Sequence, residues 1–315
     1  MNLLIGAATI GLILALLGLG VFISYRIYHT LDLTADGSFG VGAAVVGALL
    51  LVGVPPLPAT AIGALSGVVA GVITGVLNTR FLVSALLAGV LTSTALYSVS
   101  LFVMGSGNLS LATAESLVTV AERLGQRLLG LPPSLTLLGT TVSGGSLATL
   151  VLMALLVGGL AIALVAFMGT DLGLAMRAAG NNPRMAKALA IDVDRMVVLG
   201  LGLSNGLIAL SGALLAQYEG FSNIQMGIGA LVTGLANLMV GEALLGRRSI
   251  GRWIAGAVAG AVVFRLLVAA AVRAGLNPNA LKLVTALFVL AVLVLPHLVR
   301  RARPTRPAET APTHA

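Results

Sequence analysis

Long apolar runs separated by short polar breaks make up nearly the whole chain, and most of these runs approach the roughly 20 residues that a helix needs to cross a bilayer. The runs of this length cover residues 3–23, 57–77, 81–104, 147–168, 196–216, 226–245, 253–271 and 281–299. A further run, residues 39–54, is shorter and rich in glycine, and we count it as a broken second span. The pattern predicts an all-α polytopic membrane protein with about nine transmembrane helices.

Composition supports this class. The 315 residues are 58% hydrophobic and 9% charged, a balance that the surface of a soluble fold would not tolerate. A net charge of +8 is compatible with nucleic-acid binding, but the basic residues stand singly between apolar runs and are not interleaved with aromatic residues. We therefore expect no nucleic-acid partner. The absence of cysteine excludes disulfides, thiol catalysis and cysteine-based metal sites.

The distribution of Lys and Arg predicts the orientation of the spans. With the N-terminus outside, most of these residues fall in cytosolic loops, as the positive-inside rule requires. The C-terminus is then cytosolic. We expect residues 1–300 to form a single transmembrane domain and residues 301–315, which are rich in Pro, Thr and Arg, to be a disordered tail.

Two polar segments interrupt the apolar runs. In the cytosolic loop 169–195, Asn182 can cap a helix, Pro183 suits its first position, and residues 184–190 are good helix formers. This predicts a short basic helix at the membrane surface, although a solvated loop that only sets topology would show the same charge. In the outer loop 105–146, residues 117–131 have the period of an amphipathic helix, which would serve either as a lid over the span ends or as a docking surface.

An internal repeat accompanies the spans. Residues 39–47 align without gaps on residues 226–234, and the same offset superimposes spans one to four on spans six to nine. Because five spans separate equivalent points, the two copies would have opposite orientations, which is the inverted-repeat architecture of many transporters. Chance matches between Gly- and Ala-rich helices are the alternative.

The third span carries a small residue at every fourth position. These are Gly63, Gly67, Gly71 and Gly75. Such a ridge lets a neighbouring helix approach closely, so we expect a packing role within the bundle or at a dimer seam.

Motifs for catalysis and cofactor binding are absent or misplaced. The G-x-S-x-G match at 202–206 lies inside an apolar helical run instead of at a strand-to-helix turn. No H-x-x-x-H pair is present for zinc. Neither Lys187 nor Lys282 is followed by Ser or Thr, so no Walker A motif can bind ATP. We expect no enzyme activity, no metal and no cofactor, and any ATP would be bound by a separate subunit.

Ionisable residues inside the spans are few. Glu242, Arg265 and Lys282 are the candidates, and we expect Glu242 to pair with Arg247 or Arg248 just beyond its span. This leaves no convincing relay for a coupling ion, although an ion-coupled secondary carrier that acts without an ATPase remains an alternative, as does an assembly protein that transports nothing.

The translocation path is predicted from the second and seventh spans, because short Gly-interrupted helices at corresponding positions of two halves point to it. The candidates are Asp36, Ser38, Phe39, Thr233 and Asn237. Helix capping or interhelical hydrogen bonding is the alternative role for each of them.

Three segments carry a family resemblance. They resemble segments of the permease subunits of bacterial ABC importers. The three segments are residues 31–39, which run into a Gly/Ala span, residues 241–244, and the Arg-Ala-Ala-Gly-Asn-Asn-Pro sequence at 177–183. The similarity covers residues 3–299 and is greatest to the ribose and branched-chain amino acid permeases, within them to uncharacterised tryptophan/tyrosine-type permeases. Two departures are Ala190 before Ile191, where the family often has Gly-Ile, and the long outer loop.

The resemblance implies a multi-pass protein of the bacterial inner membrane that forms a homodimer surrounded by lipid. It implies two partners, a cytosolic ABC ATPase and an extracytoplasmic solute-binding protein that delivers a small solute, for which an amino acid is suggested. It also implies that the loop around 176–192 couples the permease to the ATPase. By this carry-over the contact residues are Arg177, Ala178, Ala179, Gly180, Asn181, Pro183 and Arg184.

Overall fold

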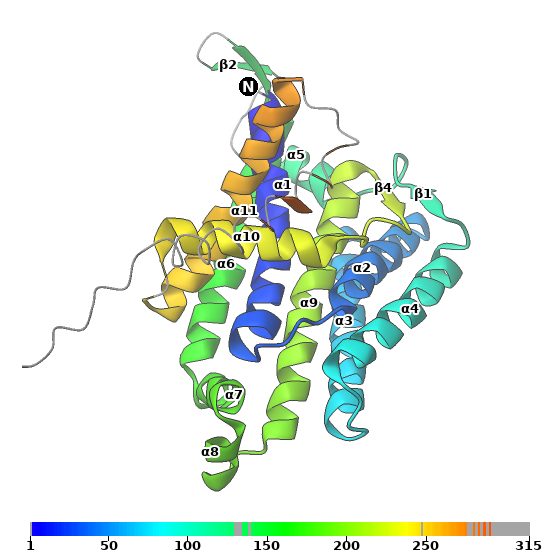
Figure 1. The fold of residues 1–315 in the computed structure, drawn as a ribbon. Helices are drawn as coiled ribbons and strands as arrows, with labels where there is room; N and C mark the ends of the chain where they lie inside the picture. Colours follow the sequence, from blue (N-terminus) through cyan, green and yellow to red (C-terminus); the bar gives the residue numbers. More distant parts are fainter. Residues whose placement is uncertain are drawn as a thin grey trace, which may run out of the picture.

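The protein is a bundle of helices in the computed structural model, which describes residues 2–128, 134–137, 140–246 and 248–275 together with residues 280, 283, 286, 287 and 290. Its helices are α1 (Asn2–Val21), the π-helical η1 (Phe22–Ile27), α2 (Thr34–Leu51), α3 (Pro56–Thr79), α4 (Ala85–Met104), α5 (Leu117–Leu128), α6 (Gly144–Gly169), α7 (Asp171–Asn181), α8 (Pro183–Ala188), α9 (Val193–Glu219), α10 (Ala230–Leu245) and α11 (Ile250–Arg273). The arrangement confirms the all-α polytopic class (Figure 1).

Seven helices among the described residues are long and apolar enough to cross a membrane. They are α1 with η1, α2, α3, α4, α6, α9 and α11. The seventh predicted span corresponds to the shorter apolar helix α10. The ninth predicted span, 281–299, and the tail 301–315 fall mostly or wholly outside the described residues.

The second span is continuous, and the expectation of a broken one was wrong. Helix α2 runs without interruption through its 18 residues. Its glycines allow close packing: a Cβ on Gly42 would lie 2.1 Å from the carbonyl oxygen of Ala209. A glycine inside a helix costs about 0.5–1 kcal/mol, which close contact with a neighbour offsets. The chain is irregular before α2 instead, where His29 has a φ of 55°.

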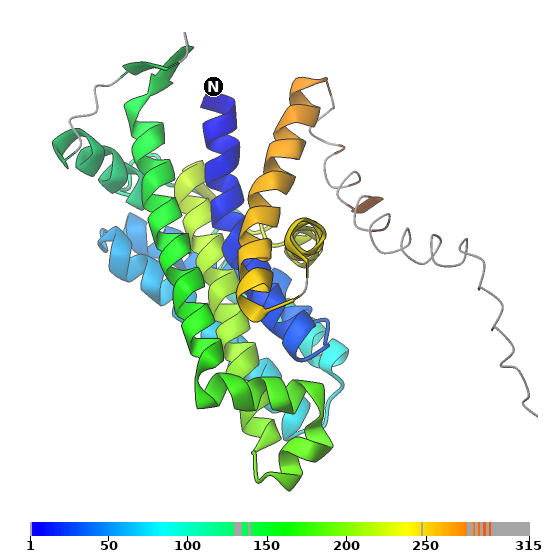
Figure 2. The same ribbon diagram turned by 90° about the vertical axis from the view of Figure 1, so that its left-hand side faces the viewer.

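The two halves of the bundle pack in corresponding ways. Helix α9 contacts α2 and α3, whereas α1 contacts α10 and α11. Helices α2 and α3 contact each other, as do α10 and α11, and α1 contacts α9. Helices α1 and α9 run in opposite directions (Figures 1 and 2). These neighbours are those of an inverted repeat that exchanges α1 with α9, α2 with α10 and α3 with α11.

The repeat does not preserve the gapless alignment at the level of single residues. Residues 39–47 lie within α2, but residues 226–229 form turns that precede α10. The first turns of the second copy have thus become a loop, and α10 is shorter than α2.

The glycine ridge of α3 faces α9. A Cβ on Gly71 would lie 2.1 Å from the Leu201 carbonyl oxygen, and one on Gly67 would lie 2.3 Å from the Asn205 carbonyl oxygen. A Cβ on Gly75 would lie 2.8 Å from the Val198 Cα, whereas one on Gly63 would lie 3.1 Å from the Gly42 carbonyl oxygen of α2 and 3.3 Å from the Ala213 Cβ. The ridge therefore lies inside the bundle, where it brings two long helices into backbone contact.

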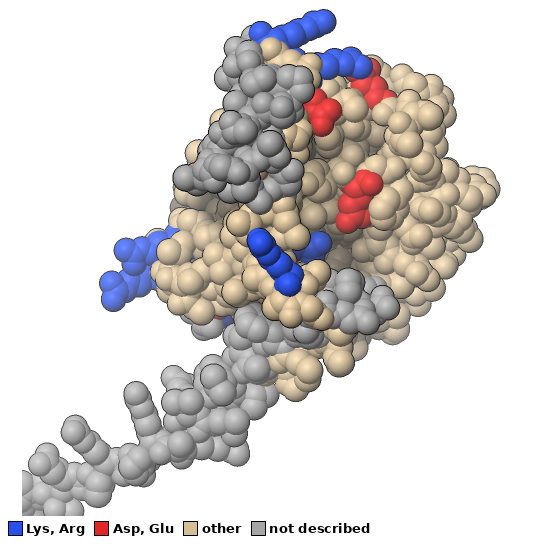
Figure 3. Space-filling view, turned by 90° about the horizontal axis from the view of Figure 1, so that it is seen from above, with Lys and Arg blue, Asp and Glu red and all other residues tan. Residues whose placement is uncertain are grey.

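The end of the bundle that carries the N-terminus also carries α5 and two small sheets (Figure 1). One sheet pairs β1 (Asn108–Ser110) with β4 (Phe221–Asn223), and the other pairs β2 (Ser134–Leu137) with β3 (Thr140–Ser143). Helix α5 buries Leu117 and Ala121 of its predicted apolar face, whereas Leu124 on the same face is 44% exposed. Charged side chains are sparse on this face (Figure 3). Helices α7 and α8 lie at the opposite end (Figure 1).

Candidate functional site

Two capped helices form the polar segment at the far end of the molecule from the N-terminus. The Thr170 hydroxyl accepts a hydrogen bond from the Gly173 N–H at 3.3 Å and so caps α7. The Asn182 side-chain oxygen accepts from the Met185 N–H at 3.1 Å, and Pro183 occupies the first turn of α8. The cap and the proline confirm the predicted start of the helix. Helix α8 ends at Ala188, two residues earlier than expected.

The end of α8 explains the departure at Ala190. The Ile191 N–H donates to the Ala186 carbonyl oxygen at 3.0 Å, and Ala190 has a φ of 57°. This closing motif places the residue after the helix in the left-handed region, which glycine adopts without strain. Alanine therefore carries strain at a position that glycine would occupy without strain.

Helix α7 is anchored to the end of the first span through its backbone. A Cβ on Gly180 would lie 2.0 Å from the Ile27 carbonyl oxygen. Ala179 and Met176 are buried beside it. No larger residue fits at position 180 without moving α7 away from η1.

Tyr28 ties the same corner to α9. Its hydroxyl donates to the Met196 carbonyl oxygen, and its ring lies against Gly200, where a Cβ would come within 2.1 Å of a ring carbon. Burial raises the pKa of the Tyr28 phenol, so the hydroxyl keeps the proton that it donates. The end of η1, the C-terminal part of α7 and the first turns of α9 thus form one packed unit.

The residues expected to contact an ATPase divide into two groups. Arg177, Ala178, Ala179 and Gly180 are half-buried or buried against the bundle, whereas Asn181, Pro183 and Arg184 are exposed. Exposed neighbours of the second group are Lys187 and two large apolar side chains, Met185 and Leu189, which are 51% and 63% exposed. Of the residues expected to contact an ATPase, only those of α8 and of the turn before it are therefore exposed, and the surface there combines positive charge with apolar contact area.

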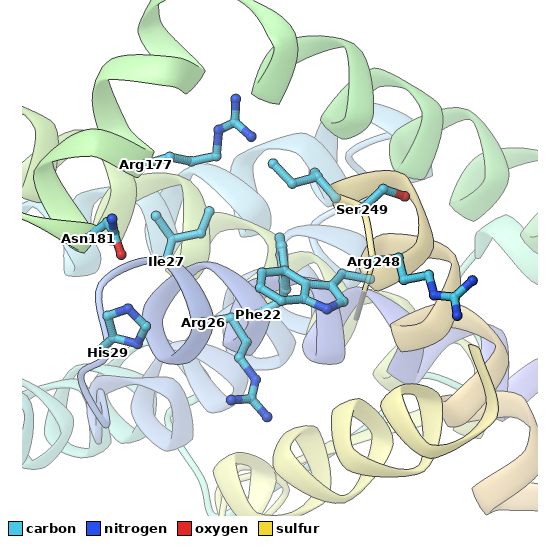
Figure 4. Close-up of a pocket in the computed structure, with 10 residues that line it drawn as sticks. Phe22, Arg26, Ile27, His29, Arg177, Asn181, Arg248 and Ser249 are labelled. Atoms are coloured by element: carbon cyan, nitrogen blue, oxygen red, sulfur yellow. The ribbon is translucent and has the colours of Figure 1, made fainter. Parts of the chain in front are cut away.

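A cavity of about 410 Å³, here called the basic cavity, opens between η1, α7 and the start of α11. Its lining is Phe22, Arg26, Ile27, His29, Arg177, Asn181, Arg248, Ser249, Ile250 and Trp253. Arg26, Arg177 and Arg248 surround an apolar centre that includes Phe22 and Ile27 (Figure 4).

Arg26 at the edge of this cavity pairs with Glu242 of α10 across 2.5 Å, with the side chains 18% and 5% exposed. Glu242 was expected to pair with Arg247 or Arg248. Among the described residues Arg248 forms no ion pair with it, and Arg247 lies outside the described residues, so that pairing stays a prediction. The π-helical turn carries Arg26 beneath α10, so the acid meets a residue of the first span that is distant in sequence. The pair joins the two halves of the bundle.

A smaller cavity, of about 120 Å³, separates the coupling segment from a buried polar network. Ala179, Gly180 and Pro183 line one side of it, and Asp32 and Thr74 line the other. One Asp32 carboxylate oxygen accepts from the Thr34 N–H at 2.9 Å, and the other accepts from the Asn205 amide at 2.7 Å.

The Asn205 side chain links three elements through this network. Its carbonyl oxygen accepts from the Ser38 hydroxyl at 2.7 Å, so it bonds α2 as well as Asp32 from the loop before α2. Prediction from sequence did not single out Asp32 or Asn205. An amide in the middle of an otherwise apolar span was the signal that could have found Asn205.

The residues predicted to line the translocation path make internal contacts. Asp36 accepts hydrogen bonds from the backbone at the start of α10, and Asn237 donates to the Leu14 carbonyl oxygen at 3.1 Å. Thr233 donates to the Gly229 carbonyl oxygen, and Phe39 is 2% exposed. Asp36 and Asn237 thus have the capping and interhelical roles that stood as the alternative, whereas Thr233 bonds back to the N-cap residue of its own helix. None of the residues lines the two cavities above, and their place in a path stays a prediction.

Metal chemistry has no site in the part of the chain that the structure describes, where no three His, Cys, Asp or Glu side chains come together. The protein instead has multiple spans, inverted packing of its two halves and a capped basic segment. These features are those of a membrane transport subunit.

Comparison with known proteins identifies the class. Residues 3–295 match the family described as branched-chain amino acid transport system / permease component. The chain is 34% identical to a tyrosine transport system permease protein of Clostridioides difficile (strain R20291), over 94% of this chain and 92% of the relative. It is also 34% identical to the uncharacterized protein RP368 of Rickettsia prowazekii (strain Madrid E), over 77% and 78% of the two chains. No solved structure matches significantly.

Fold and comparisons together define a multi-pass permease subunit of an ABC transporter in an inner membrane. The chain belongs to the branched-chain amino acid transport system permease family.

Proposed function

We propose that the chain forms the translocation path of an ABC importer and is coupled to a separate cytosolic ATPase through residues 176–192. An extracytoplasmic binding protein delivers the solute, and two copies of the chain form the permease dimer. The observation that carries the proposal is the combination of the exposed, capped helix α8 with α7 held by backbone contact between Gly180 and Ile27.

The contacts around α7 support a role for α7 and α8 as a lever that transmits movement from an ATPase to the membrane spans. An ATPase that binds α8 moves α7, and the contacts of Gly180 with Ile27 and of Tyr28 with Met196 pass this movement to the first and sixth spans. These two spans, α1 and α9, occupy equivalent places in the two halves. Rocking of the halves against each other is the common mode of alternating access in inverted-repeat transporters.

We further propose an amino acid as the solute, because the matching family and the relative from Clostridioides difficile are described as amino acid transport components. Thermal shift of the partner binding protein with individual amino acids, aromatic ones first, would identify the ligand. Stabilisation by sugars or nucleosides alone would refute an amino acid substrate.

The coupling role is tested by replacing Gly180 with leucine in proteoliposomes that hold the permease, its ATPase and the binding protein. ATP hydrolysis should continue while solute uptake falls, because α7 can no longer rest on η1. Gly251→Leu is a matched control, since a Cβ there has no neighbour within 4 Å. Normal solute-stimulated ATPase activity and uptake in Gly180→Leu would refute the lever.

Dependence on ATP separates the importer from an ion-coupled carrier. Uptake should require ATP inside right-side-out vesicles and should survive dissipation of ion gradients. Among the described residues, the buried acid Glu242 is engaged with Arg26, which favours a structural role over an ion relay. Uptake by the isolated chain that follows an ion gradient would establish the carrier instead.

A further inference from the structure

The basic cavity collects positive charge from three separate parts of the chain. Arg26 comes from η1, Arg177 from α7 and Arg248 from the loop before α11, and no acidic residue is among the lining residues. Glu242 compensates Arg26. Within the described chain Arg177 and Arg248 form no ion pair, and the buried Arg177 Nε has no hydrogen-bond partner. Two cationic side chains at this cavity therefore have no acidic partner among the residues that the structure describes.

The start of α11 adds to the positive potential. Ser249 caps this 24-residue helix, whose N-terminal end faces the cavity through Ser249 and Ile250. A helix N-terminus carries about half a positive charge. Together with the arginines it favours an anion over a cation or a neutral solute.

The floor of the cavity is apolar and aromatic. Phe22 and Trp253 meet edge to face, with ring centroids 5.8 Å apart, and Ile27 and Ile250 complete the floor. The Trp253 indole N–H has no hydrogen-bond partner among the described residues. A small inorganic anion has no apolar part that could pack on these side chains. An amphiphile with a charged head and a hydrocarbon chain matches both parts of the cavity.

The cavity also lies at the depth of lipid headgroups. The first span ends at Ile27 and the span of α11 begins at Ile250, and both residues line it. Helix α8 projects beyond α7 and lies farther from the bundle than the start of α11 (Figures 1 and 2). A cytosolic protein partner would therefore contact α8 and not the cavity, whereas a lipid would enter the cavity from the membrane.

We infer that the basic cavity binds the headgroup of an anionic phospholipid. Arg177 and Arg248 hold the phosphate, and the first part of an acyl chain lies on Ile250 and Trp253. Basic pockets between transmembrane helices on the cytoplasmic side are suited to such headgroups. The bound lipid joins α7, which carries the coupling segment, to α11 of the other half. This inference depends on the cytosolic placement of α7 but not on the solute or on ATP coupling.

The test measures lipid binding to the purified full-length permease. Native mass spectrometry after exchange into cardiolipin, phosphatidylglycerol or phosphatidylcholine should show retention of the two anionic lipids over phosphatidylcholine. Arg177→Gln and Arg248→Gln should each weaken retention about five- to tenfold, the scale of one lost arginine near a membrane surface. Arg252→Gln is the matched control, because Arg252 is exposed on the same helix end and does not line the cavity.

Several outcomes would overturn the inference. An equal loss of anionic-lipid retention in Arg252→Gln would mean that general surface charge attracts the lipid. Retention of phosphatidylcholine equal to that of the anionic lipids would show that the cavity does not select an anionic headgroup. Displacement of the lipid by millimolar inorganic phosphate would indicate a site for a soluble anion. Unchanged lipid retention in both cavity variants, with weakened ATPase co-purification, would indicate an acidic side chain of the ATPase as the occupant. Monodisperse elution of each variant shows that folding is retained.

Discussion

The Asp36 carboxylate on α2 accepts a hydrogen bond from the Leu231 N–H at 2.9 Å, and its second oxygen accepts from the Gly229 N–H at 3.1 Å. A side chain of the first half thereby caps the first turn of α10 in the second half. No local cap replaces it, since Gly229 has no side chain to offer. The contact secures the helix that departs most from the symmetry of the repeat.

Loss of this cap should destabilise the protein. Asp36→Ala leaves two N–H groups without their acceptor, and we expect a loss of about 1–2 kcal/mol in the free energy of unfolding. Asp36→Asn should be intermediate, because an amide oxygen can still accept one bond. Thermal unfolding in detergent measures the effect, with Asp194→Ala on the exposed first turn of α9 as the control. Equal shifts in Asp36→Ala and Asp194→Ala would show that the cap contributes nothing specific.

Size at the glycine ridge should matter more than helix propensity. Gly71→Ala places a methyl group 2.1 Å from the Leu201 carbonyl oxygen, so α3 and α9 must separate. We expect a loss of about 1–3 kcal/mol, the usual range for overpacking. In Gly158→Ala on α6 the added Cβ has no neighbour within 4 Å, and the substitution should gain about 0.5–1 kcal/mol. A melting temperature for Gly71→Ala at or above that of the natural protein would contradict the packing.

The strain at Ala190 should be removable. Ala190→Gly should stabilise the end of α8 by about 1 kcal/mol, because glycine adopts a positive φ without the steric cost that alanine carries. Slower hydrogen exchange at Leu189, Ala190 and Ile191 measures the gain. Ala188→Gly, inside the helix, should have the opposite effect by a similar amount. Faster exchange in Ala190→Gly would contradict the left-handed conformation.

The Asp32–Asn205 hydrogen bond should show coupling in a double-mutant cycle. Asn205→Asp brings two carboxylates together at 2.7 Å and should be strongly destabilising, about 2–4 kcal/mol. Asp32→Asn combined with Asn205→Asp restores a donor opposite an acceptor and should recover part of the loss. Thermal unfolding of all four proteins gives the coupling energy, and additive effects would mean that the two side chains act independently.

Orientation can be measured directly because the chain contains no cysteine. Leu189→Cys, at the 63% exposed position after α8, should react with a membrane-impermeant maleimide only after the cells are permeabilised. Leu3→Cys, near the N-terminus and 46% exposed, should react without permeabilisation. The reverse pattern would invert the proposed topology and remove the contact between α8 and a cytosolic ATPase.

Much of the fold could be predicted from local sequence. Apolar runs located the described spans, and the cap Asn182 with Pro183 located the start of α8, because each depends on residues only a few positions apart. Gly180 was expected, from family resemblance alone, to contact an ATPase, and that role stays a prediction. Its packing against Ile27, whose carbonyl oxygen lies 2.0 Å from where a Cβ would be, depends on the neighbouring helix and was not predicted.

The sequence by itself determined that the chain spans a membrane, where its spans lie and which segment carries a basic capped helix. Only the tertiary structure decided that Asp36 caps α10, that Glu242 pairs with Arg26 and that three arginines surround one cavity. The physical reason is that helices such as α2, α6 and α10 are apolar on all sides, so no periodic stripe marks the face that meets a neighbour. In a membrane that choice follows from the fit of small residues and buried polar groups on distant helices.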